Sequence, residues 1–236
     1  MLTYFASDIH LHPSRPETAR LFGEFLAGPA RSAEHLYLLG DLFDAWIGDD
    51  DLADPFNAGI AAALKALAEA GVHIRFLPGN RDFLIGSGFA AAAGLSLLPD
   101  ETVADIGGTP TLLLHGDTLC TADREYQDFR TLVRSPAWQR DFLAKPLAER
   151  RHVAEELRGR SEAEKRTKPM ALMDTNETAV AQAFAASGAA RMIHGHTHRQ
   201  AHHEYPGRER WVLPEWDHAG GALACDAAGC RWLALP

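Results

Sequence analysis

Short, mainly apolar runs recur along the first two hundred positions of the chain. Five of them predict β-strands, at 2–6, 36–39, 74–77, 111–114 and 190–193. Between the first three runs, stretches that begin near Pro16 and Pro55 predict helices over about 16–26 and 55–70. This strand–helix alternation over the first 115 residues predicts an α/β layered architecture.

The pattern changes between Thr121 and Ala186, where apolar residues recur at three- and four-residue intervals and predict amphipathic helices. Strand patterns return near Arg191 and at 210–213, 222–225 and 231–235. We therefore expect a single domain over residues 1–236 that carries a helical cap insertion at about 120–172.

Composition agrees with one domain, because 236 residues with 46% hydrophobic content can bury one sizeable core. No apolar run approaches the roughly 20 residues that span a bilayer, and the chain starts with a strand rather than a signal peptide. Three cysteines form neither an even set nor a Cys-x-x-Cys pair, which favours a reducing compartment and no role for them. The expected location is the cytosol.

Charge is distributed unevenly. The net charge of −9 argues against a general nucleic-acid binder. Residues 120–170 nevertheless hold 12 of the 23 Lys and Arg but only 9 of the 32 Asp and Glu, so this stretch carries +3 and the rest −12. The stretch is either a solvated helical hairpin or a basic insertion that meets something anionic.

Metal-binding residue types follow each of the five apolar runs. If the five strands belong to one sheet, they deliver seven candidate ligands to one edge: Asp8, His10, Asp41, Asn80, His115, His196 and His198. Seven exceeds the three protein ligands typical of a single catalytic metal and predicts two metals that share a carboxylate, which we assign to Asp41. Oxygen and imidazole donors without thiolate favour Mn²⁺, Fe²⁺ or Zn²⁺.

Charged residues next to these ligands suggest supporting roles. Arg81 can pair with phosphate oxygens and stabilise charge in a transition state. Asp44, Asp82 and Asp117 are placed either to orient ligating histidines or to cap loops.

The order Asp-x-His, Gly-Asp-x-x-Asp, Gly-Asn-x-Asp, His-Gly-Asp and Gly-His-x-His, from Tyr4 to about Gln200, resembles the calcineurin-like metallophosphoesterase superfamily. The resemblance implies a layered sandwich of mixed β-sheets flanked by helices. It places Asp8, His10 and His198 on one metal, and Asn80, His115 and His196 on the other. It also implies catalytic roles for Asp41, Asn80, Arg81 and His115.

Longer stretches at 39–50, 79–83 and 193–199 are similar to the UDP-2,3-diacylglucosamine diphosphatase family of lipid A biosynthesis. That resemblance implies hydrolysis of a diphosphate bond at the α-phosphorus with two Mn²⁺ ions per chain, giving UMP and 2,3-diacylglucosamine 1-phosphate. The implied substrate-binding residues are Asn80, Arg81, Asp123, Ser161, Lys165, Lys168 and His196. Lys165 stands where the family has an Asn.

The partners implied are UDP-2,3-diacylglucosamine and an anionic membrane surface, with no nucleic acid and no protein partner. We expect peripheral attachment at the cytoplasmic face of the inner membrane through the cap, with Arg124, Arg151 and Arg158 as surface candidates. One alternative is a metallophosphoesterase acting on a soluble nucleotide, such as a dinucleoside polyphosphatase or cyclic-nucleotide phosphodiesterase, with a smaller, less basic cap. Another is a non-catalytic interaction module, which should have lost ligands, whereas all seven are present.

Overall fold

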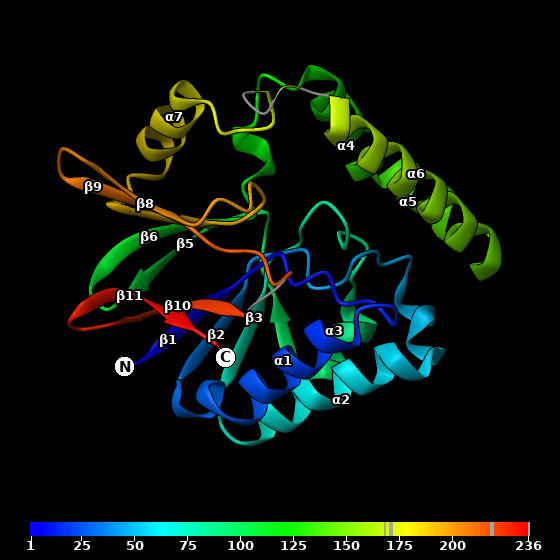
Figure 1. Ribbon diagram of the computed structural model, residues 1–236, viewed down its shortest axis with the longest axis horizontal. Coiled ribbons are helices and arrows are strands. Elements are labelled where there is room, and N and C mark those ends of the chain that lie inside the picture. The colour runs from blue at the N-terminus through cyan, green and yellow to red at the C-terminus, as the bar shows by residue number, and fades with distance from the viewer. Residues whose placement is uncertain (168, 170–171, 218–219, 236) are drawn as a thin grey trace.

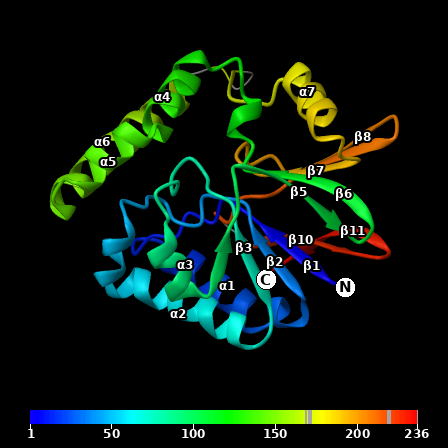
Figure 2. The ribbon, with the colours of Figure 1, turned by 180° about the vertical axis from the view of Figure 1, so that it is seen from behind.

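Two β-sheets packed face to face form the centre of the protein in the computed structural model (Figure 1). The structure describes residues 1–167, 169, 172–217 and 220–235, without side chains at 162 and 164–167. Helices cover the outer faces of both sheets, as Figure 2 shows from behind. The predicted α/β sandwich of mixed sheets with a helical cap is confirmed.

The first sheet has six strands in the order β11-β10-β1-β2-β3-β4. Strands β1 to β4 are parallel, whereas β10 pairs antiparallel with β1, and β11 with β10. The strand bounds are β1 Thr3–Ala6, β2 His35–Leu38, β3 His73–Phe76, β4 Leu95–Leu97, β10 Gly221–Asp226 and β11 Gly229–Ala234.

The second sheet has five strands in the order β5-β6-β7-β9-β8. Its three central strands, β6, β7 and β9, are parallel, and antiparallel neighbours close both edges. The bounds are β5 Glu101–Ile106, β6 Thr109–Leu114, β7 Arg191–His194, β8 Ala201–Tyr205 and β9 Arg208–Val212.

Alternate residues of central strands such as β1 and β6 enter different cores, which explains why their sequences are mainly apolar. Tyr4 and Ala6 of β1 pack toward the helices, while Phe5 between them packs between the two sheets with Leu113 and Ile193. The second sheet buries its other face against α7. The resulting order of layers is helices, sheet, sheet, helix.

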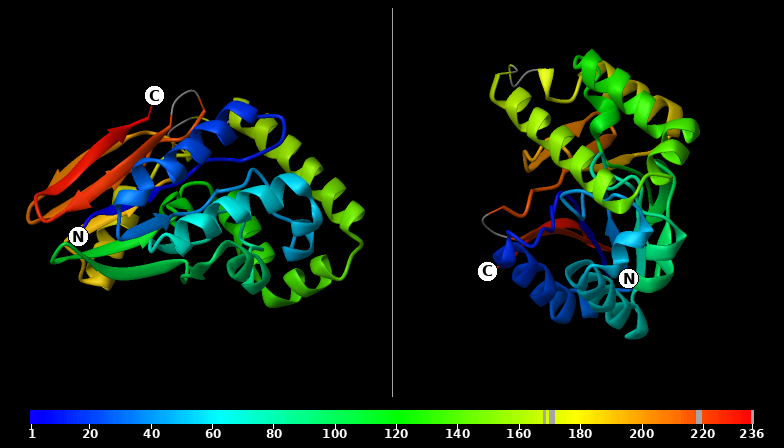
Figure 3. Two further views of the ribbon diagram at one scale, coloured as in Figure 1. Left: turned by 90° about the horizontal axis from the view of Figure 1, so that it is seen from below. Right: turned by 90° about the vertical axis from the view of Figure 1, so that its right-hand side faces the viewer.

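Helices fall into three groups. α1 (Pro16–Ala27), α2 (Pro55–Glu69) and α3 (Ser87–Ala93) cover the first sheet, and α7 (Glu177–Ser187) covers the second. Helices α4 (Arg124–Arg134), α5 (Pro136–Leu143) and α6 (Leu147–Thr167) form the cap, which reaches across one end of both sheets (Figure 3). Short 3₁₀ turns lie at Pro29–Ser32, Asp49–Ala53 and Asp117–Leu119.

Prolines at the starts of α1 and α2 begin both helices as predicted, and Asp54 caps α2 by accepting from Phe56 N–H. The described residues contain no helix with both the length and the apolar character needed to cross a membrane.

Two expectations from the sequence are wrong. The five ligand-bearing strands do not form one sheet, since β1, β2 and β3 belong to the first and β6 and β7 to the second. The cysteines are not all unpaired either: Cys225 and Cys230 are joined by a disulfide. The β10–β11 hairpin sets this pair directly opposite each other, a register that spacing alone does not reveal.

Candidate metal centre and active site

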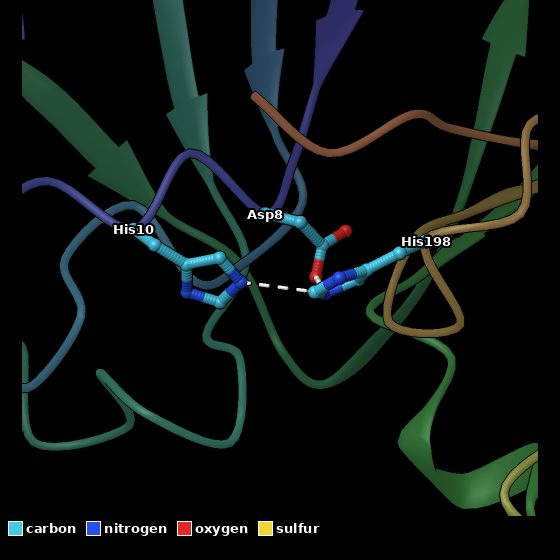
Figure 4. Close-up of side chains that lie close together, drawn as sticks. All are labelled: Asp8, His10 and His198. Carbon is cyan, nitrogen blue, oxygen red and sulfur yellow. Dashed lines mark hydrogen bonds and ion pairs between the residues drawn. The ribbon is translucent and has the colours of Figure 1, made fainter. Parts of the chain in front are cut away.

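The seven predicted ligands meet at one end of the sandwich, because β1, β2, β3, β6 and β7 all end there. The loops after β1 and β7 bring three of them together (Figure 4). His198 Nε2 lies 3.3 Å from His10 Nε2 and 3.3 Å from Asp8 Oδ1. Asp8, His10 and His198 place their donor atoms within 4.8 Å of one another, a separation that allows one metal ion to be held.

A second set of donors lies beside the first. The Asn80 side-chain oxygen is 2.9 Å from His115 Nε2 and 3.0 Å from His196 Nδ1. Asp41 reaches toward both sets, with Oδ1 3.7 Å from His115 Nε2 and Oδ2 3.8 Å from His10 Nδ1. Asp8, Asp41 and His115 also qualify as a group that could hold an ion.

Backbone strain is concentrated at this centre. Among the described residues, five that are not glycine have a positive φ, and all are predicted ligands: Asp8, His10, Asp41, His196 and His198. Their φ values lie between 53° and 68°, in the left-handed region that is unfavourable for residues with a Cβ. Such conformations cluster at functional sites. The backbone geometry therefore supports the site independently of the sequence motifs.

Glycines before the ligands are required by close backbone approach. A Cβ on Gly79 would lie 2.1 Å from Asp41 Oδ1, and one on Gly40 would lie 2.5 Å from Gly79 Cα. Any side chain at either position would push apart the loops that carry Asp41 and Asn80. The Gly-Asp and Gly-Asn motifs therefore have a steric cause.

The three neighbouring aspartates order loops and do not touch a ligating imidazole through any described hydrogen bond. Asp82 is fully buried and accepts from the backbone N–H groups of four residues, Asp41, Leu42, Phe43 and Gly79. Asp117 accepts from Tyr126 Oη and Arg130 Nε, each at 2.7 Å. Asp44 pairs with Arg81 and with Arg158 of the cap.

Protonation differs sharply between two of the histidines. Burial, together with nearby His115, lowers the pKa of His196 to about 3, so its imidazole is neutral at pH 7, as a ligand must be. Burial opposes charge on His198 as well, but hydrogen bonds with Asp8 and Glu215 outweigh it and raise the pKa to about 10. A cation that binds His198 must therefore displace a proton.

These residues fit a pair of divalent cations. Four imidazoles, two carboxylates and an amide oxygen are the donors that Mn²⁺, Fe²⁺ or Zn²⁺ accept. Asp8 is completely buried, and its Oδ1 lies 3.3 Å from His198 Nε2. A divalent cation bound between Asp8 and His198 would supply the positive charge that a buried carboxylate needs.

A cavity of about 770 Å³ opens over the centre and continues beneath the cap. Asp41, Asn80, Arg81, His196 and His198 line one part of it. Cap residues line the other part, where the apolar side chains of Phe129, Val133, Trp138, Phe142 and Leu157 lie among charged ones that include Arg130, Arg134 and Arg158. This volume is ordinary for a small-molecule site.

The predicted substrate residues are distributed around this cavity. Asp123 and Ser161 line it, and Asp123 also caps α4 by accepting from Tyr126 N–H. Lys168 lies outside the described residues, and so does the side chain of Lys165. Arg81 is held beside the centre by its backbone N–H, which donates to Asp41 Oδ1 at 2.9 Å.

Two residues at the site went unnoticed in the sequence. Glu215 contacts His198 Nδ1, and Tyr126 stacks obliquely against His196. Neither of them follows one of the five apolar runs, so no sequence signal distinguished them.

Arg151 and Arg158, two of the expected surface candidates for a membrane, form ion pairs within the chain while their side chains stay 49% and 38% exposed. Arg151 pairs with Asp51, and Arg158 with Asp44, both in the first-sheet half of the molecule. Buried Arg150 pairs with Asp50 in the same region. Part of the positive charge of the cap therefore meets carboxylates of the same chain. Arg124 is exposed, as predicted.

Comparison with known proteins agrees with this geometry. Residues 1–200 match the family model of the calcineurin-like phosphoesterases. A UDP-2,3-diacylglucosamine hydrolase of Aromatoleum aromaticum is 52% identical and covers 97% of this chain and 95% of its own. One of Escherichia coli O157:H7 is 44% identical, with all of both chains covered.

A solved structure of an archaeal phosphodiesterase aligns over the whole of both chains with a TM-score of 0.50 at 12% identity, which shows the fold alone. The catalytic fold, the grouped donors and the curated relatives lead to one conclusion. The chain is a metal-dependent hydrolase that belongs to the calcineurin-like phosphoesterases and, among them, to the family of the UDP-2,3-diacylglucosamine hydrolases.

Proposed function

We propose that the chain hydrolyses the diphosphate bond of UDP-2,3-diacylglucosamine at the α-phosphorus, giving UMP and 2,3-diacylglucosamine 1-phosphate. One observation carries the proposal: a single cavity has cation-binding residues and Arg81 in one part and apolar cap side chains in the other. This division matches a substrate with an anionic diphosphate and two acyl chains. The names of the relatives support the same substrate.

Each part of the reaction has residues suited to it. Two Mn²⁺ ions, held by Asp8, His10 and His198 and by Asn80, His115 and His196 with Asp41 shared, would polarise the phosphoryl group and supply an activated water. Arg81, whose side chain is only 12% exposed, is placed to bind the diphosphate and stabilise charge on its oxygens. The attacking water forms a bond to the α-phosphorus, and the bond from that phosphorus to the bridging oxygen breaks.

The cap is proposed to bind the lipid part of the substrate. The rings of Trp138 and Phe142 stack with their centres 4.7 Å apart, and the centre of the Trp138 ring lies 6.2 Å from that of Phe83 in the main domain. With Phe129 these rings form an apolar wall continuous with the cavity over the centre. By resemblance to the family, Ser161, Lys165 and Lys168 are proposed to bind the sugar phosphate. Asp123 and His196 are proposed as further substrate contacts.

We also propose that the cap rests on an anionic membrane at the cytoplasmic face of the inner membrane. Leu132 is 56% exposed and Leu143 is 42% exposed, so these two leucines point away from the cavity wall. Arg124 and Arg140, also exposed, lie on the same two helices, α4 and α5. Apolar and basic groups together suit the interface of an anionic bilayer.

Hydrolysis in ¹⁸O-water tests the proposal. With Mn²⁺ and UDP-2,3-diacylglucosamine, the label should appear in the phosphate of UMP, as read by phosphorus NMR. Label in the lipid phosphate would place the attack at the β-phosphorus and contradict the proposal. Soluble UDP-sugars and cyclic nucleotides in the same assay are the control, and turnover of either as fast as the lipid nucleotide would indicate a different substrate.

A further inference from the structure

We infer that Glu215 is the positioning residue that orients the imidazole of His198 for metal binding. The inference rests on the proposed metal centre but concerns a residue outside the predicted ligand set. Glu215 lies in the loop between β9 and β10, beyond the part of the chain that carries the motifs.

The contact fixes the orientation of the ring. A Glu215 carboxylate oxygen lies 2.5 Å from His198 Nδ1. A carboxylate can only accept, so Nδ1 carries the proton. The opposite nitrogen, Nε2, then faces Asp8 and His10, each at 3.3 Å. Carboxylates that hold the far side of a ligating histidine in this way fix its tautomer and raise its basicity.

The loop that carries Glu215 is attached to the ends of β1 and β7, the two strands that precede Asp8 and His198. Leu213 N–H donates to the carbonyl of His194, at the end of β7, at 2.7 Å. Trp216 N–H donates to the carbonyl of Asp8 at 3.2 Å. Glu215 is therefore placed between the segments that supply Asp8 and His198.

Packing anchors the same loop. The Trp216 indole is fully buried, with its ring centre 5.6 Å from those of both Phe22 and Phe25 on α1. Thr18 Oγ1 donates to the Trp216 carbonyl at 3.3 Å. These contacts hold the backbone of residue 215 in place even though the Glu215 side chain is 41% exposed.

His198 needs this support more than His115 does. Its side chain is 21% exposed and its backbone has a φ of 58° in a loop. His115, by contrast, is buried at the end of β6, and its Nδ1 lies 2.9 Å from the Leu39 carbonyl. Without Glu215, the ring of His198 would lose its orientation while the backbone stayed in place.

Mn²⁺ binding to the full-length chain tests the inference. Metal-free wild type, Glu215→Ala, Glu215→Gln and Asp217→Ala are compared by equilibrium dialysis with metal analysis. Glu215→Ala should weaken one of the two Mn²⁺ sites by about 10- to 100-fold, the usual effect of losing such a support. Glu215→Gln keeps an acceptor for Nδ1–H and should recover part of the loss.

Asp217→Ala is the matched control, because Asp217 lies on the same loop but pairs with Arg15. It should bind Mn²⁺ like wild type. In the His198→Ala background, adding Glu215→Ala should change Mn²⁺ affinity by less than about twofold, since the ring through which Glu215 acts is gone.

The outcomes separate the inference from the proposed function. Unchanged Mn²⁺ affinity in Glu215→Ala overturns the inference alone, as does an equal loss in Asp217→Ala or in the His198→Ala background. Wild type that binds two Mn²⁺ ions but fails to cleave the lipid nucleotide contradicts the proposed function while leaving the inference supported. Wild type that binds no Mn²⁺ overturns both.

Discussion

The left-handed backbone conformation of five predicted ligands lowers the free energy of unfolding. Each such conformation costs roughly 1–2 kcal/mol for a residue with a Cβ, so the ligand loops oppose the stability of the fold. Hydrogen bonds offset part of this cost: Asp8 Oδ2 accepts from Ser7 Oγ at 2.6 Å and from His196 N–H at 2.9 Å. The surrounding backbone thus holds the donors in place before any cation binds.

Asp41→Ala is the most direct test of the shared ligand. Asp41 extends one oxygen toward each donor set, so its loss should reduce bound Mn²⁺ by more than one ion per chain. Turnover should fall by at least about 10²-fold, since cations supply several kcal/mol of transition-state stabilisation. Metal analysis and the hydrolysis assay measure the two effects. A variant with two ions and near-normal turnover would refute the shared role.

Cys120 gives a pH-dependent prediction away from the donors. Burial, followed by the charges of Asp117 and Asp174, raises the pKa of this thiol to about 12. The thiolate is the reactive form, so its fraction at pH 8 is far below that of a free cysteine. Iodoacetamide should label Cys120 about 10²- to 10³-fold more slowly than glutathione, with a rate that rises with pH up to about 12.

Mass spectrometry of the native chain measures this labelling. Because Cys225 and Cys230 are joined, no more than one alkyl group should be added without a reductant. Rapid single labelling at pH 8 would contradict the burial of the thiol, and three labels without reductant would contradict the disulfide.

The predicted metal ligands could be recognised in the sequence, whereas the residues that position them mostly could not. Asp8, Asn80 and His198 were recognisable because ligand-type residues follow buried strands in a fixed order. Glu215 was not, because its contact with His198 depends on how the β9–β10 loop folds back on β1. Asp82 was noted, but its role in holding four backbone N–H groups required the loop geometry.

At the scale of elements, α6 is fastened to the first-sheet half of the molecule by Arg150. This side chain is 3% exposed and donates to the carbonyls of Ile47 and Lys145 at 2.5 Å and 3.0 Å, besides pairing with Asp50. Arg151, next in the chain, is 49% exposed and pairs with Asp51. The two adjacent arginines thus differ greatly in burial and in the number of groups that they contact.

Arg150→Ala should therefore lower the unfolding free energy by about 1–3 kcal/mol, because buried acceptors lose their donor. Arg151→Ala is the matched control and should cost no more than about 1 kcal/mol, as exposed ion pairs do. Urea unfolding measures both, and hydrogen exchange should rise in α6 only for Arg150→Ala. Equal effects of the two substitutions would contradict the anchoring role of Arg150.

Sequence pattern predicted the strands and helices but not which sheet each strand joined. β3 and β6 both read as short, mainly apolar runs, although only β6 is buried on both faces, because β3 buries Ile74 and Phe76 but leaves His73 exposed. Their separation depends on β4 and β5, of which β4 closes one sheet and β5 begins the other. β5 alternates exposed and half-buried residues and carries no strong apolar signal.

For the whole molecule, the cap links the active site to the proposed membrane surface. Reversing Arg124 and Arg140 to Glu should weaken binding to phosphatidylserine vesicles at least tenfold, since each basic residue near such a surface contributes about 1 kcal/mol. Arg31→Glu with Lys65→Glu is the control, with the same charge change on the outer side of the first sheet. Vesicle sedimentation at low and moderate salt measures the difference.

Both pairs of variants should keep wild-type metal content. Equal vesicle binding by the two double variants would reject the electrostatic contribution. So would wild-type vesicle binding that does not change with salt concentration. Leu132→Ser with Leu143→Ser separates the apolar contribution, and it should weaken vesicle binding at all salt concentrations because apolar burial is not screened.

The pairing of β1 with β10 has a consequence for synthesis of the chain. Thr3 lies opposite Cys225, so β1 waits for a partner that is made 222 residues later. At about 5–20 residues per second, that delay lasts roughly 10–45 s. Throughout it, β1 presents an apolar edge to the cell, the kind of edge that pairs with other chains. Newly made copies should therefore depend on chaperone protection until the C-terminal hairpin appears.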